Sequence, residues 1–255
     1  MTSLTSSKPF TLKPRHQQIL LLLYKYRFLN RKQIQQLLGH TYFNRIIIWL
    51  NQLTEHGYIY RYYDSHKVTE PAVYSLATKA RTYLLKHMAN EVQAGQLDRV
   101  WKEKNLSLQF RKHCLLLADI ALALLQTTKL TQAQLAFMTK VELQHREDLV
   151  TPLPHAVFSI TEPNGQCRYY FLDIFDELMP RMVLRKRVNQ YCSYFDEENW
   201  QDEHSENFPA IIFICAEERA KKYLHTQIKK KLLDFEELVF LLSTAKQIQS
   251  CLLYT

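Results

Sequence analysis

Apolar side chains in the N-terminal part of the chain recur every three to four residues, a spacing that predicts amphipathic helices. The first helix is expected over residues 15–27, directly after Pro14, because proline suits the first turn of a helix. Asn30 is a suitable N-cap for a second, shorter helix over residues 31–38, and Gly39 ends it.

A third amphipathic helix follows the second after a short loop. It is predicted to open at Thr41 or Asn44 and to run to about Glu55. Gly57 then supplies a C-cap, because glycine adopts without steric cost the left-handed backbone that ends many helices.

Two β-like runs come next, at residues 58–63 and 72–76, and a polar loop joins them. A fourth helix begins near Thr78. Helix, short helix, helix, β-hairpin and helix is the order of a winged helix-turn-helix, a DNA-binding module. We therefore assign residues 10–90 to such a domain, and residues 91–105 to a linker or an exposed helical extension.

The pattern changes in the second half of the chain, where a long apolar helix over residues 106–126 precedes alternating strands and helices. Asn164-Gly165 is typical of a hairpin turn. This order predicts a small α/β domain over residues 106–250, so the fold class of the whole chain is α+β. The strands are expected over residues 137–143, 156–160, 168–174, 210–215 and 238–242, and the other helices over 178–195 and 217–235.

Charge divides the chain in the same way. Residues 1–90 hold 13 lysines and arginines against three acids, a net charge of +10, whereas residues 91–255 have a net charge of −2. Such a basic domain favours a polyanion as its partner, because lysine and arginine displace condensed counterions from a phosphate backbone. The alternative is a basic domain that is merely soluble.

The remaining composition limits the class of protein. The sequence has no stretch of about eighteen uncharged apolar residues that would indicate a membrane span, and its N-terminus lacks the features of a signal peptide. The five cysteines are odd in number and widely spaced, which favours reduced thiols in the cytoplasm over disulfides or a zinc site. P-loops, glycine-rich dinucleotide turns and serine nucleophile elbows are missing from the sequence.

In a winged helix the third helix enters the major groove and its early residues reach base edges. Arginine pairs with guanine and asparagine with adenine, while other polar residues contact the backbone. The candidate DNA-binding residues are Thr41, Tyr42, Asn44 and Arg45 on the third helix, Arg31 and Lys32 on the second, and Arg61, His66 and Lys67 on the wing. Winged helices also serve as protein-docking modules, and that alternative stays open.

Several motifs taken together resemble a known family. In the first domain they are Pro14-Arg-His-Gln-Gln-Ile-Leu, the Tyr-Arg-Phe-Leu run at 26–29 and the Val73-Tyr-Ser-Leu junction. In the second they are His113 with Asp119, Pro154-His-Ala-Val-Phe, Phe171-Leu-Asp-Ile, and Arg187 four residues before Tyr191. This combination, over about residues 12–242, is similar to the replication-relaxation family of bacterial plasmid and mobile-element proteins.

The resemblance implies a winged helix followed by a restriction-endonuclease-like domain, and roles in plasmid replication, mobilisation or regulation. It also implies two or three carboxylates around Mg²⁺, from a Pro-Asp pair on one strand and Glu-x-Asp on the next. Here His155 stands in place of the first Asp and Phe175 in place of the third acid, so only Asp173 keeps a carboxylate. An imidazole and one carboxylate suit a hard cation poorly, and we expect hydrolysis to be lost.

The leading hypothesis is a non-enzymatic, sequence-specific binder of double-stranded DNA, without a cofactor, in plasmid or mobile-element replication, mobilisation or transcriptional regulation. The second domain would supply dimerisation or docking to a replication, mobilisation or transposition protein. A homodimer is expected because dimers match two-fold DNA sites. The candidate interface surfaces are the helix over 106–126 and Leu252-Leu253-Tyr254.

Under this hypothesis His155 and Asp173 form a buried hydrogen-bonded pair, and His113 is a histidine of the core or of an interface. The alternative is a Mg²⁺-dependent nuclease that uses Asp173 with His155, helped by Asp176 or Glu142. Asp176 is expected to face the opposite side of the strand from Asp173, if the strand continues that far.

Overall fold

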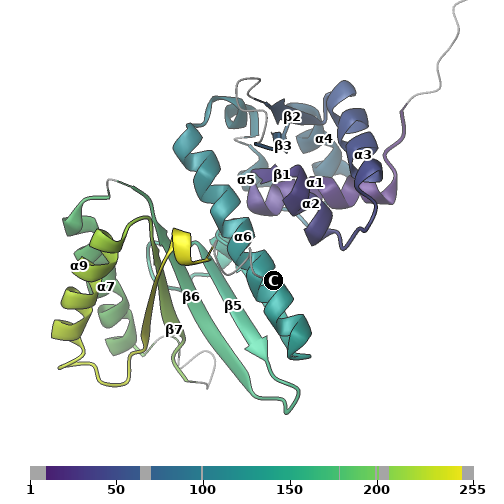
Figure 1. The fold of residues 1–255 in the computed structure, drawn as a ribbon. Helices are drawn as coiled ribbons and strands as arrows, with labels where there is room; N and C mark the ends of the chain where they lie inside the picture. The colour runs from purple at the N-terminus through teal and green to yellow at the C-terminus, as the bar shows by residue number, and fades with distance from the viewer. Residues whose placement is uncertain are drawn as a thin grey trace, which may run out of the picture. The chain divides into compact units, whose positions relative to one another are not determined.

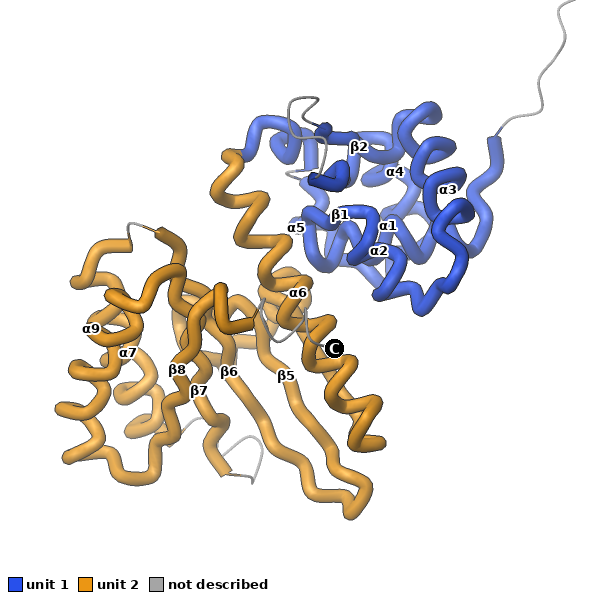
Figure 2. Tube along the Cα trace, in the orientation of Figure 1, with its two compact units in different colours: residues 1–106 blue, residues 107–255 orange. Residues whose placement is uncertain are grey.

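The computed structural model describes residues 10–63, 70–98, 100–177, 179–198, 200 and 207–248. The chain forms two compact units, residues 1–106 and residues 107–255, which we call unit 1 and unit 2 (Figure 2). Each unit combines helices with a β-sheet (Figure 1), so the chain is a mixed α and β protein, as the sequence predicts.

Unit 1 has the predicted order of helices and strands, with one additional short strand and two short helical segments after the fourth helix. Its elements are α1 (Pro14–Tyr26), β1 (Leu29–Asn30), α2 (Arg31–Leu37), α3 (Phe43–Glu55), β2 (Ile59–Tyr62), β3 (Val73–Leu76), α4 (Thr78–His87), α5 (Ala94–Leu97) and the 3-10 helix η1 (Val100–Asn105). The three strands form an antiparallel sheet in the order β1-β3-β2. The hairpin of β2 and β3 therefore pairs with the segment between α1 and α2.

Local hydrogen bonds explain where the helices of unit 1 begin and end. The Asn30 side chain accepts from the Gln33 amide and the Gln33 side chain accepts from the Asn30 amide, both at 3.0 Å, so Asn30 is the N-cap of α2 as predicted. Gly39 and Gly57 have φ of +59° and +72° and follow α2 and α3. Neither Thr41 nor Asn44 caps α3, which begins at Phe43.

The region expected to be a linker or an exposed helical extension, residues 91–105, contains α5 and η1. Leu97 and Val100 are buried there, and Arg27 donates to Glu103 at 2.7 Å. Burial raises the pKa of the Glu103 carboxyl, and the charge of Arg27 opposes this rise only in part. These contacts attach residues 91–105 to the helices of unit 1.

Unit 2 contains a five-stranded sheet in the order β4-β5-β6-β7-β8. The first three strands are antiparallel to one another and the last three are parallel. The first strand was expected over 137–143, but β4 lies three residues earlier and the chain turns after it. The elements are α6 (Leu108–Leu130), β4 (Gln134–Thr139), the 3-10 helix η2 (Leu143–His145), β5 (Ala156–Thr161), β6 (Cys167–Phe175), α7 (Arg181–Asp196), β7 (Ala210–Cys215), α9 (Glu218–Lys231) and β8 (Phe240–Thr244).

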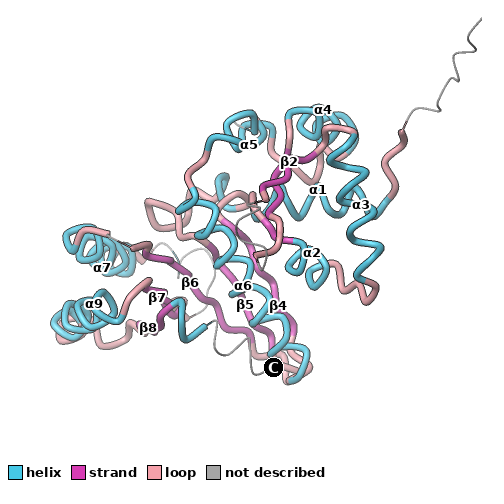
Figure 3. Tube along the Cα trace, turned by 45° about the horizontal axis from the view of Figure 1, so that its top comes forward, coloured by secondary structure: helices cyan, strands magenta, loops and turns pink. Residues whose placement is uncertain are grey.

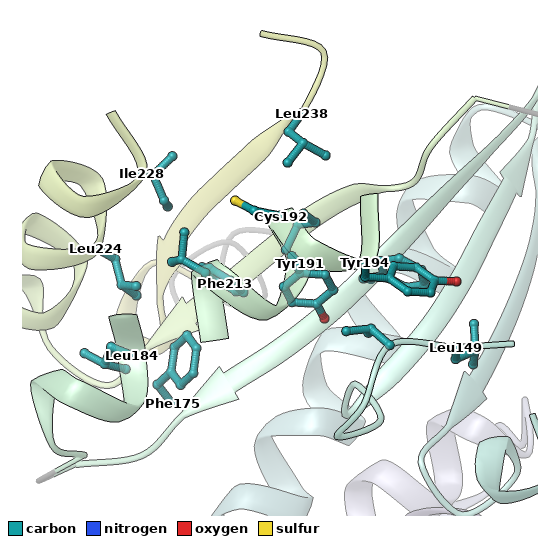
Figure 4. Packing of buried hydrophobic residues seen from close by; sticks show 14 of the residues in the cluster. Leu149, Phe175, Leu184, Tyr191, Cys192, Tyr194, Phe213, Leu224, Ile228 and Leu238 are labelled. Atoms are coloured by element: carbon teal, nitrogen blue, oxygen red, sulfur yellow. The ribbon is translucent and has the colours of Figure 1, made fainter. Parts of the chain in front are cut away.

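Helices cover both faces of this sheet, α6 one face and α7 with α9 the other (Figure 3). Successive residues of β6 alternate between the two cores, since Phe171 and Phe175 pack on the α7 side while Leu172 and Ile174 pack on the α6 side. Figure 4 shows the core on the α7 side, where Tyr191 packs close to Phe213. Asp173 lies between Phe171 and Phe175 in the alternation and therefore faces α7.

Among the described helices, α6 alone is long and apolar enough to cross a membrane by length and composition. In the structure its Leu117 and Ile120 pack against Phe158 and Leu172 of the sheet. Part of the apolar surface that the sequence offered as a dimer interface is thus occupied within unit 2. The other candidate surface, Leu252-Leu253-Tyr254, lies outside the described residues.

Candidate functional site

One side of α3 is exposed along its length. Asn44, Arg45, Ile48 and Asn51 all lie on it, and Ile48 has 48% of its surface exposed although it is apolar. The opposite side is inserted in the core of unit 1 through Ile46, Leu50 and Leu53, which are fully buried. This three- and four-residue spacing gives α3 one anchored face and one free face.

A buried histidine connects α3 to α1. The Lys13 amide donates to Nδ1 of His16 at 3.1 Å, so Nε2 carries the ring proton and donates to Oε1 of Gln52 on α3 at 3.0 Å. Burial lowers the pKa of His16 below its ordinary value, against the effect of the hydrogen bond to Gln52. The neutral ring therefore helps to fix the orientation of α3 in unit 1.

The loop between α2 and α3 is held by side chains that the sequence analysis did not single out. Nδ1 of His40 accepts from the Tyr42 amide at 3.1 Å, and the His40 ring meets Trp49 of α3 edge to face at 5.0 Å between centroids. Gln35 donates to the Thr41 carbonyl at 3.2 Å. These bonds explain why α3 begins at Phe43 and leave Tyr42 73% exposed just before it.

The basic candidates on α2 and β2 have different environments. The Arg31 guanidinium lies over the Phe43 ring, 4.0 Å from its centroid, while Lys32 beside it is exposed. Arg61 is exposed on β2, with its guanidinium 5.6 Å from the Tyr63 ring centroid. His66 and Lys67 lie outside the described residues.

The structure therefore brings the candidates of the third helix together in one place. Thr41, Tyr42, Asn44 and Arg45 are all exposed at the N-terminal end of α3, and Arg31 stacks on Phe43 at the same end. Neither Asn44 nor Arg45 makes a side-chain hydrogen bond or ion pair with any described residue. Their hydrogen-bonding groups are thus available to a partner.

Unit 2 contains the second candidate site, a buried cluster centred on Asp173 of β6. Oδ1 of Asp173 lies 2.9 Å from Nδ1 of His155, and Oδ2 accepts from Nε of Arg187 at 2.5 Å and from the Tyr191 hydroxyl at 2.8 Å. Burial opposes ionisation, but the hydrogen bond from His155 and the charge of Arg187 outweigh it and hold the pKa of Asp173 well below its ordinary value. His155 and Asp173 form the hydrogen-bonded pair expected from the sequence, but only Asp173 is buried, since 31% of the His155 side chain is exposed.

Arg187 completes this cluster from α7. Its Nη1 donates to the Pro152 carbonyl at 2.7 Å and its Nη2 to the Tyr191 hydroxyl at 3.0 Å. Burial acts to lower the pKa of Arg187, but its interactions with Tyr191 and with the Asp173 carboxylate raise it above its ordinary value. Burial and the Asp173 charge raise the pKa of Tyr191, so its hydroxyl stays protonated and donates. The sequence pointed to the spacing of Arg187 and Tyr191, and both side chains contact the same carboxylate.

A second imidazole–carboxylate pair adjoins the first. Nδ1 of His113 on α6 lies 3.0 Å from Oδ1 of Asp176, directly after the end of β6. Asp176 thus faces α6 while Asp173 faces α7, the opposite sides expected from the sequence. The His113 and His155 rings nevertheless meet where β6 ends, with their centroids 4.6 Å apart.

The donor set around Asp173 does not fit the Mg²⁺ that the family resemblance implies. Both of its oxygens already accept hydrogen bonds from protein groups, including a guanidinium that occupies the place of a cation. Phe175, at the position of a third acid, packs in the core, and Glu142 accepts from the Thr139 amide at 2.7 Å. Within the described ranges, no three His, Cys, Asp or Glu side chains are grouped to hold a metal ion.

In a comparison with known protein families, residues 20–211 match the replication-relaxation family. The match runs from α1 in unit 1 to β7 in unit 2 and includes α3, Asp173 and Arg187. Searches of curated proteins and of solved structures found no match. Because the match covers well over half of the sequence and both units, the chain belongs to the replication-relaxation family.

Proposed function

We propose that the chain binds double-stranded DNA through unit 1, as a winged helix with α3 in the major groove. The observation that carries this proposal is the exposed face of α3, on which Asn44 and Arg45 have no side-chain bond to any described residue. This face belongs to residues 1–90, which have a net charge of +10. Family membership supports a role in replication or mobile-element biology. We propose that this role needs neither catalysis nor a cofactor.

The chemistry of the exposed face suits base recognition. Arg45 can donate two hydrogen bonds to a guanine edge, and Asn44 can pair with an adenine edge. Ile48 lies one turn further along, where an exposed apolar side chain can contact a thymine methyl group. The face therefore offers both polar and apolar contacts to a major groove.

Basic residues beside α3 would fix its position on the duplex. Lys32 and the stacked Arg31 lie at the start of α2, and Arg61 lies on β2 next to the proposed wing. Such residues contact phosphates and set the register of the protein without reading sequence. His66 and Lys67, in the segment between β2 and β3, are expected to add further backbone or minor-groove contacts.

We assign unit 2 to dimerisation or docking to another protein. Its central sheet flanked by α6 on one face and α7 with α9 on the other supports a restriction-endonuclease-like domain in which Arg187 neutralises the retained carboxylate. A homodimer would present two winged helices to a two-fold DNA site. Sedimentation of the free chain, with and without a palindromic site, tests this part of the proposal.

The main test is a gel shift on DNA from the neighbourhood of the gene, at moderate salt. Arg45→Ala should weaken specific binding by about 1 to 3 kcal/mol, roughly five- to 150-fold, because one bidentate base contact is lost. Arg81→Ala is a matched control, since Arg81 is already paired with Asp98 at 2.5 Å in the same unit. It should bind DNA nearly as the unmodified chain does.

Indifference of binding to both Arg45→Ala and Lys67→Ala would contradict the proposal. It would favour the alternative in which unit 1 docks on a protein. Lys32→Ala provides an additional check, because loss of one phosphate contact should weaken binding to all sequences alike and reduce the salt dependence by about one charge.

A second candidate function is metal-dependent cleavage of DNA, favoured only by the position of Asp173 near the end of the central strand, next to His155. A plasmid cleavage assay with Mg²⁺ and with Mn²⁺ separates it from the first. We expect no cutting above background. Cutting by the unmodified chain that is abolished in Asp173→Asn would establish the nuclease instead.

A further inference from the structure

His113 and His155 are each held at one ring nitrogen by a carboxylate. Asp176 lies 3.0 Å from Nδ1 of His113 and Asp173 lies 2.9 Å from Nδ1 of His155. Because the Asp173 carboxylate is paired with the Arg187 guanidinium, it accepts from Nδ1 of His155, which therefore carries the ring proton; the Ile174 amide lies 3.2 Å from the same nitrogen. Within the described part of the chain, no hydrogen bond engages Nε2 of either ring.

An imidazole oriented in this way is prepared to bind a metal ion. Histidine ligands in metal sites typically donate their other ring N–H to a carboxylate, which fixes the tautomer and increases the basicity of the ligating nitrogen. His113 and His155 both show this arrangement, and they come from different elements, α6 and the segment before β5.

The distance between the ring centroids leaves room for one ion to be shared by the two imidazoles. Two imidazoles that bind one metal ion at roughly 2.0 to 2.1 Å in neighbouring positions have ring centroids about 4.5 to 5.3 Å apart. The centroids of His113 and His155 lie 4.6 Å apart, with 55° between the ring planes. The side chains are 11% and 31% exposed, so water or another small ligand can complete the coordination.

We propose that His113 and His155 together bind one divalent transition-metal ion, of which Zn²⁺ is the chemical type, through their Nε2 atoms. Imidazole nitrogens suit Zn²⁺, Co²⁺ and similar ions, whereas Mg²⁺ needs the oxygen ligands that this cluster does not offer. Asp176 and Asp173 support the ligands from behind. The proposal does not depend on DNA binding by unit 1.

The ion would also join two layers of unit 2. His113 belongs to the helix that covers one face of the sheet, while His155 is bonded through Asp173 to α7 on the other face. A metal bridge at the end of β6 would therefore fasten α6 to the sheet. Binding of the ion should stabilise unit 2 against unfolding, because the ion binds only where the two histidines are brought together.

Isothermal titration of the full chain with Zn²⁺, and absorption spectroscopy with Co²⁺, test this proposal. We expect one ion per chain, and a loss of affinity of at least about tenfold in both His113→Gln and His155→Gln. Asp176→Asn should weaken binding by about ten- to 100-fold, as loss of a carboxylate behind a histidine ligand does. His225→Gln, which removes an exposed histidine on α9, is the matched control and should leave binding unchanged.

Absence of saturable binding to the unmodified chain would overturn the proposal. Saturable binding that persists unchanged in His113→Gln would overturn it equally, because the ion would then be held by other surface groups. Circular dichroism establishes that the variants are folded. If His155→Gln does not fold, His113→Gln and Asp176→Asn decide the outcome, since they leave the cluster of Asp173, Arg187 and Tyr191 intact.

Discussion

The exposed face of α3 in unit 1 and the Asp173 cluster in unit 2 use polar residues in opposite ways. Asn44 and Arg45 are exposed and have no side-chain bond to any described residue, whereas Asp173 and Arg187 are buried and bonded to each other. A buried charge must be paired inside the protein, while an exposed one can be left for a partner. The difference is that the polar groups on the exposed face of α3 are available to a partner, whereas those of the Asp173 cluster are already bonded to one another inside unit 2.

The largest effect is expected from breaking the buried pair in unit 2. Arg187→Met keeps much of the side-chain volume but leaves the Asp173 carboxylate without its cation. The free energy of unfolding should fall by about 3 to 5 kcal/mol, as for other buried pairs that lose one member. Chemical denaturation of the full chain, followed by circular dichroism, measures the change.

Arg185→Met on the same helix is the control, because Arg185 is exposed. It should change the free energy of unfolding by less than about 0.5 kcal/mol, as surface substitutions generally do. Equal stability of the two variants would mean that the Asp173 cluster contributes little to the fold. The proposed contrast between the exposed polar residues of α3 and the buried, bonded residues of unit 2 would then be wrong.

A second effect concerns the surface of unit 1. Ile48→Asp places a negative charge in the middle of the exposed face of α3 without disturbing the buried side. DNA binding should weaken by about 2 kcal/mol, roughly thirtyfold, because like charges brought together across an interface are unfavourable. A gel shift measures binding, and thermal unfolding should be nearly unchanged.

Met182→Asp provides the same chemical change in unit 2. Met182 is 70% exposed on α7, so the variant should keep both stability and DNA affinity. Loss of DNA binding in Met182→Asp as large as in Ile48→Asp would move the proposed DNA contact away from unit 1. If the unmodified chain, Ile48→Asp and Met182→Asp all bound DNA with equal affinity, α3 would not be the recognition helix.

A smaller effect, on the stability of unit 1, is expected when the N-cap of α2 is removed. Asn30→Ala removes the side chain that accepts from the Gln33 amide at the start of α2. The free energy of unfolding should fall by about 1 kcal/mol, the usual consequence of losing an N-cap. Gln36→Ala, an exposed change within α2, is the control for denaturation and should have little effect. A similar loss in both variants would contradict the role of the cap.

Local patterns were sufficient to predict most helices and strands, because the formation of these elements depends mainly on neighbouring residues. The Asn30 cap, the positive φ of Gly57 and the strand at 210–215 follow from spacing and residue type alone. The start of α3 was wrong by one or two residues because a side chain in the preceding loop, His40, fixes the backbone there. Such a bond has no signature in hydrophobic periodicity.

The features that the sequence did not predict are contacts between residues that are distant along the chain. The resemblance to a family pointed to His155 and Asp173, and to Arg187 and Tyr191, but gave no reason for Arg187 to bind the carboxylate directly. The contact between His113 and Asp176 joins residues 63 positions apart, through the packing of α6 on the sheet. The sequence places each side chain on its element, and only the tertiary structure brings the elements together.

In unit 1, the bond between His16 and Gln52 also joins residues that are distant in the sequence, and local patterns do not predict it. Burial lowers the pKa of His16 in the folded chain, so below the ordinary value of about 6.5 the unfolded chain binds more protons than the folded one. The stability that the neutral ring provides is therefore complete above that pH and declines as the pH falls below it. Urea unfolding at pH 7.5 and 5.5 should show a larger acid-induced loss for the unmodified chain than for His16→Gln, which has no imidazole to protonate. A parallel decline in both proteins would mean that other groups cause the loss.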